Sequence, residues 1–101
     1  MLYILQCNDF YKIGLTTNLK ARVAELQCGN PYKLNLIGSF DVPDNFEWRV
    51  HKFLKDAGRN VGGEWFSLTV DDVAELKKKC KLREQIHHEQ KVSNPCPVQY
   101  W

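Results

Sequence analysis

The sequence predicts an α/β fold in which a small antiparallel sheet of about three strands is flanked by helices. Two observations carry this prediction. First, residues 2–6 and 10–14 are rich in Tyr, Ile, Leu and Phe, which favour strands, and they flank the turn-forming pair Asn8-Asp9. Second, three later segments repeat apolar residues at helical spacing between start and stop signals. A chain of 101 residues has the length of one domain.

The two-residue turn determines which side chains of the hairpin share a face. It pairs Tyr3 with Gly14 and Leu5 with Lys12, so Tyr3 and Lys12 are expected to point to the same side of the sheet. A three-residue loop would place them on opposite sides. The register of this hairpin is therefore a condition for any site that uses both residues.

The next two predicted elements are a helix over residues 18–28 and a strand over residues 33–42. The helix carries an apolar stripe made by Leu19, Val23 and Leu26. Arg22 precedes Leu26 by four residues, so it flanks the buried stripe. The strand prediction depends on the alternation of Leu34, Leu36 and Phe40.

A second helix is predicted over residues 45–57, between Pro43-Asp44 and Gly58. Glu47 falls within about 20° of Leu54 on the helical wheel, at the margin of the buried face, and His51 lies one turn further along. The predicted buried face consists of Phe46, Val50, Phe53, Leu54 and Ala57.

A third helix is predicted over residues 70–82, with acids in its first turn. Its apolar face consists of Val70, Val73, Leu76 and Cys80. Leu82 and Ile86 are out of phase with this face, so the helix is expected to bend, end or find another partner after about Lys81. We assign residues 1–75 to the core of the domain. Residues 76–101 are assigned to a basic helical extension and an apolar tail packed on that same domain.

Composition restricts the compartment and the partners. The net charge of +2 does not by itself indicate a nucleic-acid partner. The four cysteines form no Cys-x-x-Cys pair, and no secretion signal precedes the first strand, so free thiols in a reducing cytoplasm are expected. No apolar run approaches the ~20 residues of a membrane span, so no membrane partner is expected. Basic residues cluster at Lys77, Lys78, Lys79, Lys81 and Arg83.

The most informative feature is the series Lys12-Ile13-Gly14, Arg22 and Glu47. A strand ending in glycine, an arginine helix and a carboxylate helix can place a cation, a metal ligand and a tight turn around one phosphate. Phosphodiester cleavage needs a base, a positive clamp and a divalent ion. Taken singly, each residue also has a structural interpretation, such as an edge-strand lysine or an ion pair between Arg22 and Glu47.

In this order and spacing, the sequence resembles the GIY-YIG nuclease superfamily. It is most similar to the compact phage-type branch, which has Lys-Ile-Gly in place of Tyr-Ile-Gly. The resemblance covers about residues 2 to 73, whereas the first motif lacks its leading Gly-Ile and the superfamily's late asparagine has no clear match. The matching landmarks are Tyr3-Ile4, Lys12-Ile13-Gly14, Leu19-x-x-Arg22-Val23-x-x-Leu26, Glu47-x-x-x-His51-x-Phe53 and Gly63-Glu64-Trp65-Phe66.

The resemblance implies a role for each site residue. Tyr3 would act as general base or hold the attacking water, and Lys12 would favour its phenolate or help to orient the water. Arg22 would grip the scissile phosphate. Glu47 would be the single protein ligand of Mg²⁺ or Mn²⁺, and His51 would orient Glu47 or contact phosphate.

DNA is the expected partner, and RNA remains an alternative substrate. Cutting both strands with one centre would need a homodimer, sequential nicking or a larger complex. The expected phosphate contacts come from Arg22, Arg49, Lys52, Lys77, Lys78 and Lys81. The competing interpretations are an inactive nucleic-acid-binding or inhibitory module of the same fold and a protein adaptor that uses the apolar tail.

Overall fold

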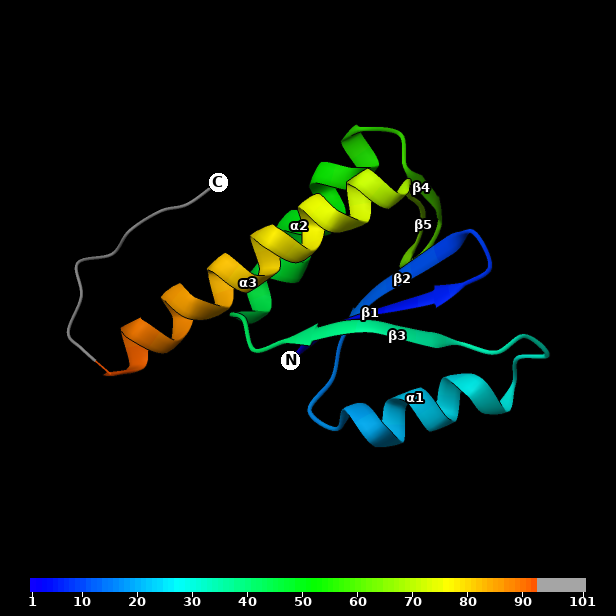
Figure 1. Cartoon of the computed structure of the whole chain (residues 1–101), viewed down its shortest axis with the longest axis horizontal. Helices are drawn as coiled ribbons and strands as arrows, with labels where there is room; N and C mark the ends of the chain where they lie inside the picture. The colour runs from blue at the N-terminus through cyan, green and yellow to red at the C-terminus, as the bar shows by residue number, and fades with distance from the viewer. Residues whose placement is uncertain (93–101) are drawn as a thin grey trace.

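The computed structural model describes the backbone of residues 1–92 and the side chains of residues 1–88. It confirms the α/β class, with three helices and a five-stranded antiparallel sheet (Figure 1). Along the chain the elements are β1 (Leu2–Cys7), β2 (Phe10–Leu15), α1 (Leu19–Cys28), β3 (Asn35–Phe40), α2 (Asp44–Asp56), β4 (Asn60–Gly62), β5 (Trp65–Ser67) and α3 (Val70–Val92).

The hairpin of β1 and β2 has the predicted register. Tyr3 pairs with Gly14 and Leu5 pairs with Lys12. The turn is the two-residue one, and Asn8 adopts a φ of 55°, in the left-handed region that asparagine tolerates. Tyr3 and Lys12 therefore share a face of the sheet.

The prediction of about three strands was too low, because two short strands follow α2. The sheet has the order β3-β1-β2-β5-β4. The extra strands β4 and β5 reverse direction through Gly62 and Gly63, whose φ angles of 150° and 53° suit glycine. Each has only three residues, which is too short for the periodicity of the sequence to reveal.

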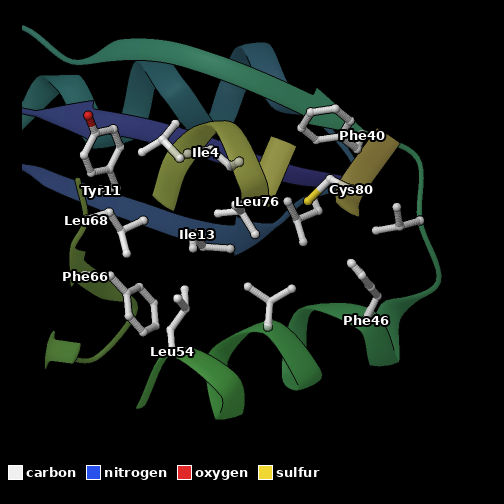
Figure 2. Close-up of a cluster of buried hydrophobic side chains, with 14 residues drawn as sticks. Ile4, Tyr11, Ile13, Phe40, Phe46, Leu54, Phe66, Leu68, Leu76 and Cys80 are labelled. Atoms are coloured by element: carbon white, nitrogen blue, oxygen red, sulfur yellow. The ribbon is translucent and has the colours of Figure 1, made fainter. Parts of the chain in front are cut away.

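Helices cover both faces of the sheet, so the fold has three layers (Figure 1). On one face, α2 and α3 pack on the larger core, shown in Figure 2, which includes Ile4, Ile13, Phe46, Phe66 and Leu76. On the other face, α1 covers a smaller core made by Tyr3, Leu5 and Leu34, with Leu19, Val23 and Leu26 packed against it. The side chains of β1 alternate between the two cores, as the period of a strand requires.

The helix predictions were wrong about three residues that were assigned to buried faces. Phe53 and Val70 are 55% and 81% exposed, and Ala57 is also exposed, so none of them joins the core. The helix α3 extends beyond the predicted range of 70–82 to Val92, and after Lys81 it finds another partner, which is one of the three outcomes expected. It continues because polar contacts replace the apolar stripe: Glu84 accepts a hydrogen bond of 2.6 Å from the backbone N–H of Asp41, and His88 Nε2 lies 2.9 Å from Asp41 Oδ2.

Among the described residues, Cys7, Cys28 and Cys80 are free cysteines. Burial, helped by the nearby charge of Glu84, raises the pKa of the Cys80 thiol to about 12, so this thiol is unreactive. Cys96 and the apolar tail lie outside the described residues. Within residues 1–92, no helix combines the length and the apolar character needed to cross a bilayer.

Candidate active site

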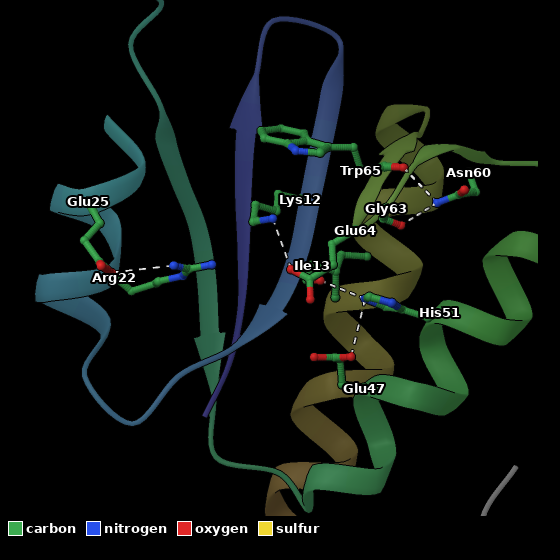
Figure 3. A network of polar contacts seen from close by, with 10 residues as sticks. All are labelled: Lys12, Ile13, Arg22, Glu25, Glu47, His51, Asn60, Gly63, Glu64 and Trp65. Atoms are coloured by element: carbon green, nitrogen blue, oxygen red, sulfur yellow. Dashed lines mark hydrogen bonds and ion pairs between the residues drawn. The ribbon is translucent and has the colours of Figure 1, made fainter. Parts of the chain in front are cut away.

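The site is centred on the C-terminal half of β2, where one edge of that strand has no strand beside it. On this edge, strand β5 pairs with β2 only at Phe10, Tyr11 and Lys12. Beyond that point, the N–H of Ile13 donates to the carbonyl of Glu64 at 3.1 Å, and the carbonyl of Ile13 accepts from His51 Nε2 at 2.7 Å. Beyond the end of β5, a side chain of α2 therefore satisfies the backbone of β2, as Figure 3 shows.

Tyr3 lies at the centre of the sheet under α1, and its side chain is fully buried. Its hydroxyl oxygen has no hydrogen-bond partner of acceptable geometry among the described residues. Gly14 lies directly beside the ring, because a Cβ at this position would be only 2.5 Å from the hydroxyl oxygen. The glycine of the Lys-Ile-Gly series is thus needed to make room for the tyrosine.

Arg22 comes from α1, which begins after Asn18 because the Asn18 side chain accepts a hydrogen bond from the N–H of Ala21. The neighbouring hydroxyl of Tyr3 raises the pKa of the Arg22 guanidinium, and Glu25 adds to this effect. The guanidinium also lies 3.5 Å from Glu25, and the Arg22 side chain keeps 39% of its surface exposed. It stands between the phenol of Tyr3 and solvent, where it can reach a ligand.

Lys12 is nearly buried on the same face, with an exposed fraction of 8%. Its ammonium lies 3.1 Å from Glu64 Oε2 and 5.5 Å from the centre of the Trp65 ring. This charge is therefore compensated in the absence of a ligand. Figure 3 shows Lys12 and Glu64 pointing toward one another, with their ion pair drawn as a dashed line.

Glu47 projects from the first turns of α2 toward the open edge of β2 (Figure 3). Burial raises the pKa of its carboxyl, and the negative charges of Glu64 and Asp44 add to the increase, whereas His51 and Lys12 oppose it. The carboxylate of Glu47 is thus placed in a setting that disfavours its charge. A cation bound there would relieve both the burial cost and the repulsion from Glu64.

The side chains around Glu47 offer a hard divalent ion one carboxylate ligand, but they do not form a complete coordination shell. Glu47 offers carboxylate oxygens, with Glu64 as a second negative charge nearby, and such ligands match Mg²⁺ or Mn²⁺. Among the described side chains, no three His, Cys, Asp or Glu residues converge as a ready-made metal site. Glu47 fits the part of a single protein ligand, with water and phosphate oxygens completing the shell, as is usual for Mg²⁺.

His51 has a structural partner in the ligand-free protein. Because a carbonyl can only accept, Nε2 of His51 carries the proton that it donates to Ile13. The ring also packs edge-on against Phe66, with the ring centres 5.1 Å apart. Glu47 Oε1 lies 3.8 Å from the same nitrogen, too far for a hydrogen bond. His51 therefore positions the edge of β2 beside Glu47.

The structure places Arg22 beside Tyr3 and brings the charge of Lys12 to bear on Glu47, but it separates the expected phosphate contacts into groups. Arg22 lies on the α1 face, whereas Arg49 and Lys52 lie on the outer side of α2. Lys77, Lys78 and Lys81 are exposed on α3, which covers the face opposite α1. Lys79 differs from them because it packs over the ring of Phe53 at 4.8 Å.

Replacing Lys77, Lys78 and Lys81 together with glutamine is expected to weaken DNA binding equally for unrelated sequences. These three residues span about 100° of the helix. The magnitude of the slope of log affinity against log salt concentration should fall by about two to three, because each lost phosphate contact contributes about 0.9 to it. Binding titrations at several salt concentrations measure the slope. Lys79→Gln is the matched control and should change it little, and an unchanged slope in the triple variant would show that the run is a solvated surface.

Two residues near the site were not assigned roles from the sequence. Glu64 compensates Lys12, but its place depends on the pairing of β5 with β2, which the sequence pattern does not reveal. Trp48 directly follows Glu47 and is 63% exposed. A tryptophan on the polar side of an amphipathic helix is a signal that the sequence did contain.

Comparisons with known proteins identify the family of this chain. The model of the T5orf172 domain matches residues 1–81, a range that includes Tyr3, Lys12, Arg22 and Glu47. No curated protein and no solved structure matches the chain. Because the match spans most of the sequence, the protein belongs to the T5orf172 domain family, a phage-associated family of nuclease-like domains.

Proposed function

We propose that the protein is a metal-dependent endonuclease that hydrolyses phosphodiester bonds in DNA. The observation that carries this proposal is the shared face of Tyr3 and Lys12 beneath Arg22, with Glu47 entering at the open edge of β2. These are the groups that the resemblance to GIY-YIG nucleases would require. The nuclease-like character of the family supports DNA as the partner.

The buried hydroxyl of Tyr3 indicates in which order the steps of the proposed mechanism occur. A buried hydroxyl without a hydrogen bond costs free energy and calls for an explanation. We infer that Arg22 leaves Tyr3 when it binds a phosphate oxygen, because its fork fits phosphate and its side chain is partly exposed. The phenol oxygen then becomes available to orient the attacking water.

In the reaction, the water oxygen bonds to phosphorus, and the bond from phosphorus to the leaving oxygen breaks. Tyr3, acting as a phenolate base, takes the proton of the water, and Lys12, on the same face of the sheet, helps to orient that water. Arg22 balances the charge that builds up on the phosphoryl oxygens. A divalent ion held by Glu47 would stabilise the leaving oxygen and supply a bound water that protonates it.

Incubation with supercoiled plasmid tests the proposal. We expect nicked or linear product with Mg²⁺ or Mn²⁺ and none with a chelator. A sample of the Glu47→Gln variant, purified in parallel, is the control for contaminating nuclease. Cleavage that persists in the chelator, or equally in this variant, would contradict the proposed mechanism.

A second candidate function is binding without cleavage. One observation favours it: Lys12, which replaces the second tyrosine of the superfamily, is already paired with Glu64 at 3.1 Å. Such a module would need Arg22 and the basic surface but not Glu47. Binding of DNA without any metal-dependent nicking of plasmid or of single-stranded DNA would establish this alternative.

A further inference from the structure

The outer side of α2 carries an aromatic ring that the proposed chemistry does not use. Trp48 is 63% exposed, although it occupies the position next to Glu47. Lys52, one turn further along, holds its ammonium 5.5 Å from the centre of the Trp48 ring. The ring is thus kept in place by a cation and presents open surface to solvent.

Two hollows meet at this ring, and one of them leads to the site. A hollow of about 290 Å³ is lined by Trp48, Lys52, Lys55 and Asp56 together with the site residues Glu47 and His51. On the other side of Trp48, a hollow of about 480 Å³ is lined by Trp48, Arg49, Lys52, Phe53 and Asp56. Trp48, Lys52 and Asp56 line both hollows, so the two adjoin along α2 at the indole.

The charges around the ring suit the backbone of a nucleic acid. Arg49, Lys52 and Lys55 supply three cations along this side of α2, and the acids that line the same hollows are Asp56 and the site residue Glu47. Aromatic rings set among cations are the usual means of holding single strands: the cations bind phosphates and the rings stack on bases. Bases paired within a duplex hide their faces from a protein ring, but an unpaired base exposes its face.

We propose that Trp48 stacks on an unpaired nucleobase beside the scissile phosphate, so that the preferred substrate is single-stranded or locally unpaired DNA. This inference rests on the proposed function, because it takes the phosphate to lie at Glu47. Glu47 and Trp48 are neighbours in sequence and point about 100° apart around the helix. A phosphate bound by Arg22 at the site beside Glu47 would therefore leave its adjoining base within reach of the indole, with Lys52 and Lys55 beside the following backbone.

Binding measured in a chelator tests the inference separately from cleavage. Fluorescence anisotropy of a labelled single strand should show that Trp48→Ala weakens binding about 5- to 150-fold, the usual contribution of one stacked base. Affinity for the matching duplex should change less than two-fold, as roughly ±0.4 kcal/mol allows. The salt dependence should be unchanged, because no phosphate contact is lost.

Three controls separate stacking from other effects of the substitution. Trp48→Phe keeps an aromatic face and should retain most of the affinity for the single strand. Tyr32→Ala removes a comparably exposed ring, 57% exposed, from the other side of the molecule, and should have no effect. An abasic strand of equal length and charge should bind the parent and Trp48→Ala equally. Melting temperatures of all variants confirm folding.

Each outcome is informative about one of the two proposals. If Trp48→Ala binds the single strand as tightly as the parent, or loses single strand and duplex equally, the stacking inference is wrong, whether or not plasmid is cut. If binding follows the expected pattern while no substrate is cut in Mg²⁺ or Mn²⁺, the stacking surface stands and the proposed enzyme does not.

Discussion

Replacing Glu47 with glutamine is expected to abolish metal-dependent cleavage while leaving a more stable fold at neutral pH. The amide keeps the shape of the side chain but cannot anchor a divalent ion. A metal contributes several kcal/mol to the transition state of such a reaction, so the loss should be at least about a hundred-fold. Binding of DNA in a chelator should be retained or improved, because a negative charge has been removed.

The stability effect follows from the raised pKa of the Glu47 carboxyl. A carboxyl whose pKa is higher in the folded protein than its ordinary value of 4.5 holds its proton longer when folded. The free energy of unfolding therefore decreases as pH rises through the window from 4.5 upward to the raised pKa. The glutamine of Glu47→Gln does not ionise, so the free energy of unfolding of this variant does not decrease through the window. Above the window, its melting temperature should therefore exceed that of the parent.

Thermal melts at several pH values, with and without Mg²⁺, measure this effect beside the nicking assay. Mg²⁺ should raise the melting temperature of the parent but not of Glu47→Gln, because only the parent binds it. Asp44→Asn is the matched control: it removes an exposed carboxylate from the first turn of the same helix and should leave cleavage intact. Equal activity of Glu47→Gln and the parent would mean that the carboxylate is structural.

Substitution of Arg22 by alanine should reduce both cleavage and binding, each by roughly ten- to a hundred-fold. A hydrogen bond between a charged donor and phosphate contributes about 1.5–3 kcal/mol, and Arg22 would make it both before and during the reaction. Arg22→Lys should recover only part of the loss, since a lysine keeps the charge but not the two-pronged geometry. Nicking assays and anisotropy titrations together measure both effects.

The alternative is that Arg22 serves only its ion pair with Glu25. That pair is exposed, and such pairs contribute about 0–1 kcal/mol to stability. Glu25→Gln breaks the same pair while leaving the guanidinium, so it is the matched control and should retain cleavage. If Arg22→Ala lowers only the melting temperature, with full cleavage by the folded protein, the phosphate-binding role is wrong.

The parts of the fold that could be predicted are those with local causes. The register of the hairpin follows from a two-residue turn and the period of a strand, so the shared face of Tyr3 and Lys12 was accessible from the sequence. The start of α1 follows from a side-chain cap on Asn18. The family landmarks then identified which residues on these elements to combine.

The parts that could not be predicted depend on contacts between distant segments. Glu64 reaches Lys12 only because β5 pairs beside β2. The last turns of α3 are held by Asp41, which lies 47 residues before His88 in the chain, and hydrophobic periodicity gives no sign of such polar anchors. The role of His51 could not be predicted for a similar reason, because its partner is the backbone carbonyl of Ile13, which no pattern of side chains indicates.

The early end of β5 has a consequence for how two layers of this protein can cooperate. In a continuous sheet, side chains on opposite faces are separated by the backbone. A residue in one helical layer therefore cannot share a ligand with a residue in the other. Here β2 keeps β1 on one side, but on its other side β5 pairs with it only as far as Lys12, and His51 of α2 bonds to the carbonyl of Ile13. At this open edge the charge of Lys12, from the α1 layer, acts on the carboxyl of Glu47, from the α2 layer. Lengthening β5 by two residues should cover this edge and separate the two charges.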